Sequence, residues 1–318
     1  MTRRLTFGLL VLVPLAAVAI AVYASFIRDD GYTQPLVRVV GPAPEPAHAA
    51  VPSSSAPSVP GVSLAAVDAF YLRLNKPPRA GLVFDLDSGS ALWRLHPERT
   101  VPIASLTKIM TALLVVERTR PNEPVRITPA ALRYSGSGVG VLPKGRRVRL
   151  ETLLNGLLIV SGNDAAIALA VHVAGSEPRF VREMNEQARE WGLDCTHFAS
   201  SHGLEDGNRS CARDLAVLTR LAMQRPRIRR IVRREQADFR FPIKGHRLWL
   251  SGHNPLQRLG YAGTLGLKTG YTDAAGRCFV GVVRRGGRTL GVVLLNSKDP
   301  AKHAPKLLDA AFATELVG

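Results

Sequence analysis

The first apolar segment, residues 5–27, contains no charged residue and follows two arginines near the start of the chain. A run of this length can cross a bilayer as a helix, and basic residues before it are typical of a cytoplasmic end. Two interpretations stay open: an uncleaved membrane anchor, or a signal peptide cut near Ala24. Both predict residues 1–31 as an anchor or signal segment and place the remainder of the chain outside the cytoplasm.

The next segment has no apolar periodicity. Residues 41–60 read "GPAPEPAHAAVPSSSAPSVP", which offers nothing to bury. Such a composition is typical of a semi-extended linker. We therefore predict a linker over residues 32–63 and a domain over residues 64–318.

Within the domain, short β-patterns at both ends enclose a helical middle. Alternation and a turn at 87–89 predict a hairpin over 80–95, and a strand at "GLKTGYT" and a hairpin split by Gly286 and Gly287 follow in the last third. Apolar runs predict a short helix near Val67 and further helices over 105–116, 150–160, 164–175, 179–193, 210–223 and 304–316, with Ser210 as a helix cap. This order predicts an α+β domain whose sheet gathers the first and last segments.

The formal net charge of +17 points to an anionic partner. Because the chain starts like an exported protein, anionic envelope polymers and lipid head groups are expected, and nucleic acid is not. The densest cluster, "RPRIRRIVRREQ" from Arg225, is interpreted as a solvated helix face.

Three cysteines are too few for a disulfide framework. Cys195 and Cys211 could pair in an oxidising compartment, and Cys278 stands in an apolar run that predicts burial.

Ser105 and Lys108 are three residues apart at the start of a predicted helix, so they share one face. A neutral lysine amine can accept the proton of a serine hydroxyl, whereas an arginine cannot. The helix N-terminus also favours negative charge developing at the serine. Alone, this pair fits a capping serine beside a surface lysine equally well.

Two further motifs change that balance. Ser161-Gly162-Asn163 separates two predicted helices, and Lys268-Thr269-Gly270 lies on a predicted strand whose glycine would admit a substrate backbone. Taken alone, the first motif predicts only a break between helices, and the second predicts only an edge strand. The order Ser-x-x-Lys, Ser-x-Asn, Lys-Thr-Gly is the motif set of penicillin-binding proteins and class A β-lactamases.

With these motifs the sequence resembles the low-molecular-mass penicillin-binding proteins of the serine D-alanyl-D-alanine carboxypeptidase family, peptidase family S11. The resemblance covers about residues 67–297 through "ASLTKIMTA", "LLNGLLIVSGNDAAIALA", "FASSHGLEDGNRSCARDLA" and "GLKTGYTDAAGRCFVGVVRRGG". It implies a β-lactamase/transpeptidase-like fold with an antiparallel sheet. One departure is Cys211, where the family usually has threonine.

The resemblance also implies catalytic roles. Ser105 would be the acylated nucleophile, Lys108 its base, and Ser161 a proton shuttle to the leaving group. The backbone N–H groups of Ser105 and Tyr271 would form the oxyanion hole.

Substrate binding is implied for a second set of residues. Asn163 would hold the amide side of the substrate. Lys268 and Thr269 would contact its terminal carboxylate, with Gly270 allowing close approach.

The expected activity is removal of the terminal D-alanine from peptidoglycan stem pentapeptides, with β-lactams as covalent inhibitors and the membrane as a partner of the N-terminal segment. Cofactors and metals are not expected, because the histidines lack a metal-site pattern. The sequence contains no Gly-x-Ser-x-Gly motif, which argues against an α/β-hydrolase. Three alternatives stay open: a DD-endopeptidase, a class A-like β-lactamase and a catalytically silent wall-binding scaffold. The region between Asn163 and Lys268 lacks a Glu-x-x-Leu-Asn stretch, which argues against the β-lactamase.

Overall fold

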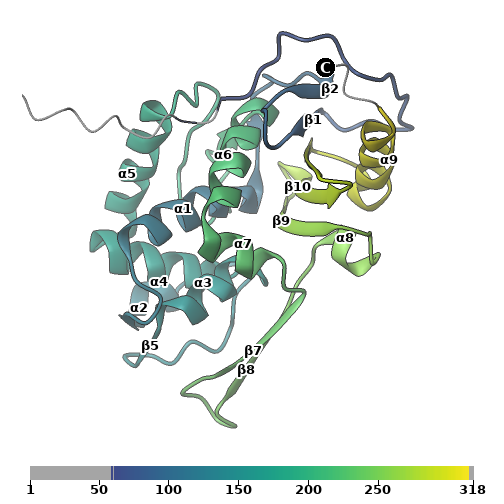
Figure 1. Cartoon of the computed structure of the whole chain (residues 1–318). Coiled ribbons are helices and arrows are strands. Elements are labelled where there is room, and N and C mark those ends of the chain that lie inside the picture. Colours follow the sequence, from purple (N-terminus) through teal and green to yellow (C-terminus); the bar gives the residue numbers. More distant parts are fainter. Residues whose placement is uncertain (1–58, 60, 315–318) are drawn as a thin grey trace, which may run out of the picture. The chain divides into compact units, whose positions relative to one another are not determined.

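The computed structural model describes residues 59 and 61–314 (Figure 1). The predicted anchor or signal segment, and the linker up to residue 58, lie outside the described residues. Among the helices of the described part, none is both long and apolar enough to cross a membrane.

A five-stranded antiparallel sheet forms the centre of the domain, and it joins the first strands of the domain to the last. In spatial order its strands are β2 (Ala91–Leu95), β1 (Ala80–Asp85), β11 (Arg288–Leu295), β10 (Gly276–Arg285) and β9 (Thr264–Thr272). The β1–β11 pairing runs from Ala80 opposite Leu295 to Asp85 opposite Leu290. This arrangement confirms the predicted α+β class, and it leaves β9 as an edge strand.

Helices cover both faces of the sheet. On one side lie a 3-10 turn, η1 (Ala104–Thr107), and the helices α1 (Lys108–Arg118), α2 (Pro129–Leu132), α3 (Leu150–Leu158), α4 (Asn163–Ala174), α5 (Glu177–Glu190), α6 (Ala212–Gln224) and α7 (Pro226–Val232). On the other side lie α8 (Pro255–Arg258) and α9 (Pro300–Ala313) (Figure 1).

Alternation along the strands explains this layering. In β1, Leu82 and Phe84 are buried in the larger core with the helical region, whereas Val83 joins the smaller core against α9. Successive side chains of a strand point to opposite faces, so an all-apolar strand is expected to be covered on both sides.

Three two-stranded pairs complete the described part. They are β3 (Val101–Pro102) with β6 (Arg209–Ser210), β4 (Pro124–Arg126) with β5 (Arg147–Arg149), and β7 (Gln236–Arg240) with β8 (Arg247–Ser251). The β7–β8 hairpin extends away from the rest of the domain in Figure 1.

The helix predicted near Val67 is wrong. Residues 65–79 contain no helix, and Val67 and Tyr71 are exposed. Phe70, Leu72 and Leu74 recur at every second position and pack against the smaller core. Period-two burial requires extended backbone, so the segment runs along the sheet instead of coiling.

One helix cap and one helix start differ from the prediction. Cys211, and not Ser210, is the N-cap of α6, because Ser210 pairs with Val101 in the β3–β6 ladder. The last helix begins at Pro300, earlier than predicted, with Asp299 as its cap. Proline at the first helical position is favourable, since its missing N–H is not needed there.

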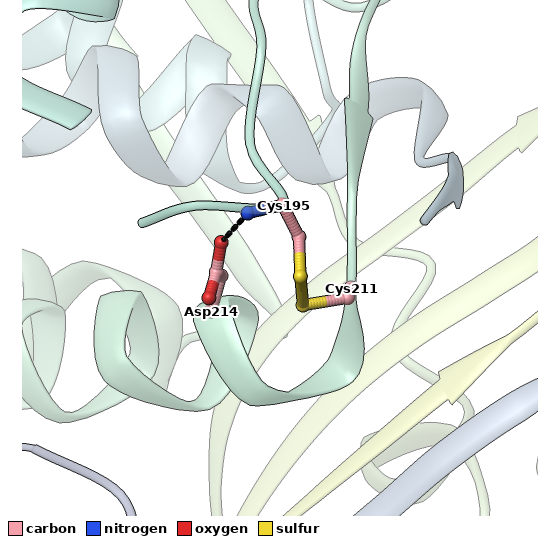
Figure 2. Close-up of side chains that lie close together, drawn as sticks. All are labelled: Cys195, Cys211 and Asp214. Carbon is pink, nitrogen blue, oxygen red and sulfur yellow. Dashed lines mark hydrogen bonds between the residues drawn. A yellow bond between two sulfur atoms is a disulfide. The ribbon is translucent and has the colours of Figure 1, made fainter. Parts of the chain in front are cut away.

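The cysteine predictions are confirmed. Cys195 and Cys211 form a disulfide with Cα atoms 5.6 Å apart (Figure 2), and Cys278 is free and buried.

The basic cluster is only partly solvated. Arg225 and Arg227 form ion pairs with Glu117 and Glu151, while Ile228 faces the core.

Candidate active site

Ser105 lies in the turn that connects β3 to α1. The preceding Ala104 has a left-handed backbone with φ of 49°, which is strained for alanine. Gly203 approaches this turn so closely that a Cβ at Gly203 would lie 2.0 Å from the Ala104 carbonyl oxygen. Only glycine can occupy that position, and the contact holds the turn in its strained form.

Lys108 is fully buried directly behind Ser105. Its Nζ lies 2.9 Å from Ser105 Oγ, 2.7 Å from Asn163 Oδ1 and 2.7 Å from the carbonyl oxygen of His202. A charged amine would donate to all three oxygens. A neutral amine donates to two and can accept the hydroxyl proton of Ser105.

Electrostatics favours the neutral form. Burial lowers the pKa of Lys108 well below its ordinary value, and the positive charge of Lys268 lowers it further. Asp164 and Glu205 oppose this shift, but burial dominates. The Lys108 amine is therefore suited to take a proton at neutral pH.

Ser161 and Asn163 come from the break between α3 and α4. Ser161 has a left-handed backbone with φ of 63°, so the chain turns sharply and the side chain borders the same cavity as Ser105. Asn163 bridges two elements: its Oδ1 accepts from Lys108, and its Nδ2 donates to the Ser135 carbonyl at 2.6 Å.

The edge strand β9 supplies the opposite wall. Lys268 is buried, its Nζ donates to the Thr269 carbonyl at 2.7 Å, and burial lowers its pKa to about 7. Gly270 lies against the Ser105 turn, since a Cβ there would be 3.0 Å from both Ile103 O and Ser105 N.

A cavity of about 600 Å³ opens between these elements. Five predicted residues line it: Ser105, Ser161, Thr269, Gly270 and Tyr271. The other three do not. Lys108 donates to Ser105 from behind, and Asn163 accepts from Lys108. Lys268 borders a separate small hollow beside Thr269.

The cavity also contains residues that the motifs did not reveal. They are Ser137, His253, Arg277, Lys298 and Asp299, together with apolar neighbours from β10 and the α9 start. These positions come from segments far apart in the sequence, so no local pattern brings them together. Cationic groups outnumber acidic ones in this set, which suits an anionic ligand.

Two supporting residues act mainly through hydrogen bonds. Asp164 accepts from the backbone N–H groups of Val139 at 2.8 Å and Gly140 at 2.9 Å, which fixes the loop carrying Ser137. His202 offers its backbone carbonyl to Lys108. Burial lowers the pKa of its imidazole, although Glu177 and Glu205 lie 3.7 and 3.8 Å away.

One group in the described part, Cys195, Cys211 and Asp214, brings three metal-ligand atoms together. Its two sulfur atoms are bonded to each other (Figure 2), and the Asp214 carboxylate accepts from Cys195 N at 2.9 Å. The donor set is thus committed to structural bonds and does not fit a metal.

The fold and the site together define a class. A serine at a helix start, a buried lysine of depressed pKa beside it, and an edge strand with a second lysine have the geometry of a serine–lysine acyl-transfer enzyme.

The chain belongs to the D-alanyl-D-alanine carboxypeptidase family, peptidase family S11, whose sequence model matches residues 77–299. It is 32% identical over 250 residues to the D-alanyl-D-alanine carboxypeptidase DacF of Bacillus subtilis, covering 74% of this chain and 62% of that protein. It is 37% identical over 222 residues to DacB2 of Mycobacterium tuberculosis, covering 69% of this chain and 75% of that protein.

A solved structure agrees. The crystal structure of a D-alanyl-D-alanine carboxypeptidase from Mycobacterium tuberculosis matches with a TM-score of 0.71 and 33% identity, over 77% of this chain and 94% of that one. Fold and sequence therefore lead to the same family.

Proposed function

We propose that the protein is a serine D-alanyl-D-alanine carboxypeptidase that removes the terminal D-alanine from peptidoglycan stem peptides through an acyl-enzyme at Ser105. The observation that carries this proposal is the 2.9 Å contact between Ser105 Oγ and a buried Lys108 of lowered pKa. Family membership and the cationic cavity support it.

In the first step, Ser105 Oγ attacks the carbonyl carbon of the penultimate D-alanine while its proton passes to Lys108 Nζ. The tetrahedral oxyanion is held by the backbone N–H groups of Ser105 and Tyr271; β9 is the edge strand, so its outer side is not paired with another strand. The bond to the terminal D-alanine nitrogen then breaks, and that nitrogen receives a proton through Ser161.

In the second step, water attacks the ester carbonyl and Lys108 again takes the proton. Ser105 Oγ leaves with that proton, which restores the enzyme and releases the shortened peptide. Lys108 is suited to both steps because hydrogen bonds to Asn163 and to the His202 carbonyl hold its amine beside Ser105 Oγ.

Residues of strand β9 and of the break between α3 and α4 would orient the substrate. Thr269 lines the cavity and would contact the terminal carboxylate directly. Lys268 would also contact the carboxylate, and Asn163 would hold the amide side of the substrate. Neither lines the cavity, so each would have to exchange a present hydrogen bond for one to the substrate. A carboxylate beside Lys268 would raise the pKa of that lysine from about 7, so binding would favour its charged form.

We also propose that residues 1–31 anchor the protein in the membrane and that residues 32–63 tether the domain outside the cytoplasm. The uncharged run of residues 5–27 supports this. Intact mass measurement of the protein from its native membrane would decide: a mature start near Ala24 would contradict the anchor.

Labelling with a fluorescent penicillin, compared between wild type and Ser105→Ala, tests the catalytic proposal. We expect stable labelling that the variant abolishes. Equal labelling of both would overturn the role of Ser105, and absence of labelling would support the silent scaffold. Rapid release of hydrolysed penicillin would indicate a β-lactamase.

Digestion of purified muropeptides with mass spectrometry then defines the reaction. Loss of one alanine per pentapeptide is expected. Conversion of cross-linked dimers to monomers would indicate the endopeptidase alternative instead.

A further inference from the structure

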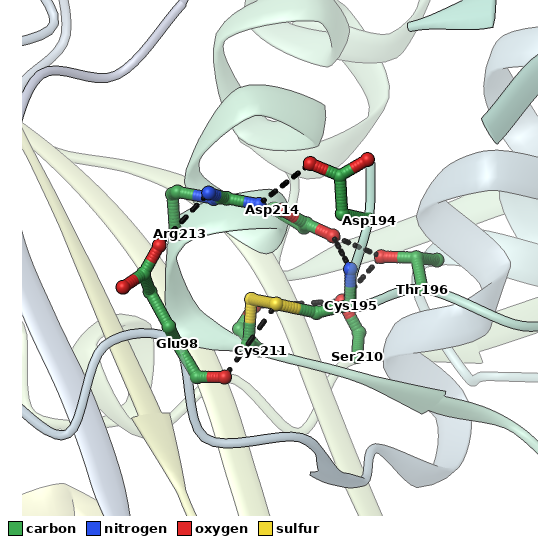
Figure 3. The surroundings of a disulfide bond; sticks show 8 residues. All are labelled: Glu98, Asp194, Cys195, Thr196, Ser210, Cys211, Arg213 and Asp214. Atoms are coloured by element: carbon green, nitrogen blue, oxygen red, sulfur yellow. Dashed lines mark hydrogen bonds and ion pairs between the residues drawn. A yellow bond between two sulfur atoms is a disulfide. The ribbon is translucent and has the colours of Figure 1, made fainter. Parts of the chain in front are cut away.

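The segment between α5 and α6, residues 195–211, wraps the back of the candidate base, and we call it the clamp loop. Its two ends are joined by the Cys195–Cys211 disulfide (Figure 3). Within it, the carbonyl of His202 accepts from Lys108 Nζ at 2.7 Å, and that of Ser201 accepts from Thr111 Oγ1 at 2.6 Å. The clamp loop thus supplies two oxygen acceptors to the first turns of α1.

The clamp loop also contacts the backbone that leads into the nucleophile. Ser210, next to Cys211, pairs with Val101 in the β3–β6 ladder, and Asn208 O accepts from Ile103 N at 3.1 Å. Ile103 lies two residues before Ser105. The chain that presents the nucleophile is therefore held by the C-terminal end of the clamp loop.

The surroundings of the disulfide keep it in place. Asp214 Oδ2 accepts from Cys195 N at 2.9 Å and from Thr196 Oγ1 at 2.8 Å, and Ser210 Oγ lies 2.8 Å from Thr196 Oγ1. Arg213 pairs with Asp214 (Figure 3). These bonds gather both ends of the clamp loop onto the first turn of α6.

We propose that the Cys195–Cys211 disulfide is a positioning element of the active site, which holds the His202 carbonyl on Lys108 and β6 on the strand that leads into Ser105. The inference rests on the proposed function, in which Lys108 is the base. Neither cysteine lines the cavity, so both act through other residues.

Opening the disulfide would first change the environment of the Lys108 amine. Burial is the largest cause of its lowered pKa, so water that enters behind a loosened clamp loop would raise that pKa. The charged and titratable groups that face Lys108 are Lys268 from β9, Asp164 from α4, and Glu205 and His202 from the clamp loop. Lys268 and Asp164 would keep their places, whereas the other two would move with the loop. Withdrawal of the Glu205 carboxylate would lower the pKa of Lys108, but the loss of burial, which raises it, is the larger effect.

The test compares full-length wild type with the double variant Cys195→Ala/Cys211→Ala by the rate of acylation with a fluorescent penicillin from pH 5 to pH 9. We expect full final labelling of the variant, a midpoint at higher pH than that of wild type, and slower acylation on the acid side of that midpoint, because a raised pKa leaves less of the amine neutral there. A midpoint equal to that of wild type would overturn the proposal.

Leu307→Ala is the matched control. Leu307 is buried in the smaller core on α9, away from the clamp loop, so its loss destabilises the domain without touching Lys108. We expect this variant to keep the wild-type midpoint. A shift in the control as large as that in the double variant would mean that general loosening, and not the disulfide, sets the midpoint.

Reduction of folded wild type with a water-soluble phosphine gives the same comparison without mutation, should the double variant fail to fold. With one water molecule the reductant converts the disulfide to two thiols and becomes the phosphine oxide. Thiol titration after denaturation should rise from one, Cys278, to three. Unlabelled wild type would instead refute the proposed function, which keeps the two failures distinct.

Discussion

Replacing Gly270 by alanine would put a methyl group where β9 approaches the Ser105 turn. The added Cβ would lie 3.0 Å from Ile103 O, 3.0 Å from Ser105 N and 3.2 Å from Ala104 Cβ. Two of these neighbours are backbone atoms, so no side-chain rotation relieves the contact. The strand and the turn must separate by a few tenths of an ångström.

The size of the effect follows from that displacement. Overpacking of a tight contact costs about 1–3 kcal/mol of stability. Misplacing reacting groups by a full 1 Å costs about 100-fold in rate, so a few tenths should cost about three- to tenfold. The environment of Lys108 stays closed, and the midpoint of the acylation pH profile should not move.

The assay measures the second-order rate of acylation by a fluorescent penicillin, together with the thermal midpoint. Gly61→Ala is the matched control, because a Cβ at Gly61 would meet nothing within 4 Å. We expect the control to behave as wild type. A Gly270→Ala enzyme with the wild-type rate and thermal midpoint would show that the strand does not constrain the nucleophile.

Three further predictions follow from burial and bonding. The thermal midpoint of wild type should rise between pH 7 and pH 10, because the pKa values of Lys108 and Lys268 are lowered in the folded state. The unfolded state therefore binds more protons than the folded state in this range. Lys268→Met should flatten the rise, and an unchanged slope would contradict this prediction. Denaturant titration of Cys195→Ala/Cys211→Ala should show a loss of about 3 kcal/mol, since the disulfide closes a loop of sequence separation 16, and a loss below about 1 kcal/mol would refute that value. Asp164→Ala should slow acylation and lower stability by about 1–3 kcal/mol for each loop amide left without its acceptor, measured by labelling rate and denaturant titration.

Local patterns predicted the elements with strong periodicity. The hairpin over 80–95 and the helices that became α3 and α4 depend on apolar spacing and turn residues, which are visible in the sequence. The segment near Val67 failed because an apolar-rich stretch of eight residues suits either period, and only the neighbouring sheet decides between them.

The motifs predicted which residues would meet, but not how they are supported. Nothing in the sequence marks His202 as a partner of Lys108, because the contact uses its backbone carbonyl. The role of Asp164 was equally hidden, since it holds a loop 24 and 25 residues earlier through backbone N–H groups. Such contacts depend on tertiary packing and leave no side-chain signature.

The two buried lysines, Lys108 and Lys268, both have lowered pKa values. Each alone would be costly, since burial disfavours a charged amine. The charge of Lys268 lowers the pKa of Lys108, while burial alone lowers the pKa of Lys268 to about 7. While Lys268 is charged, its charge therefore favours the neutral form of Lys108. The protonation states of the two lysines are therefore coupled through electrostatics.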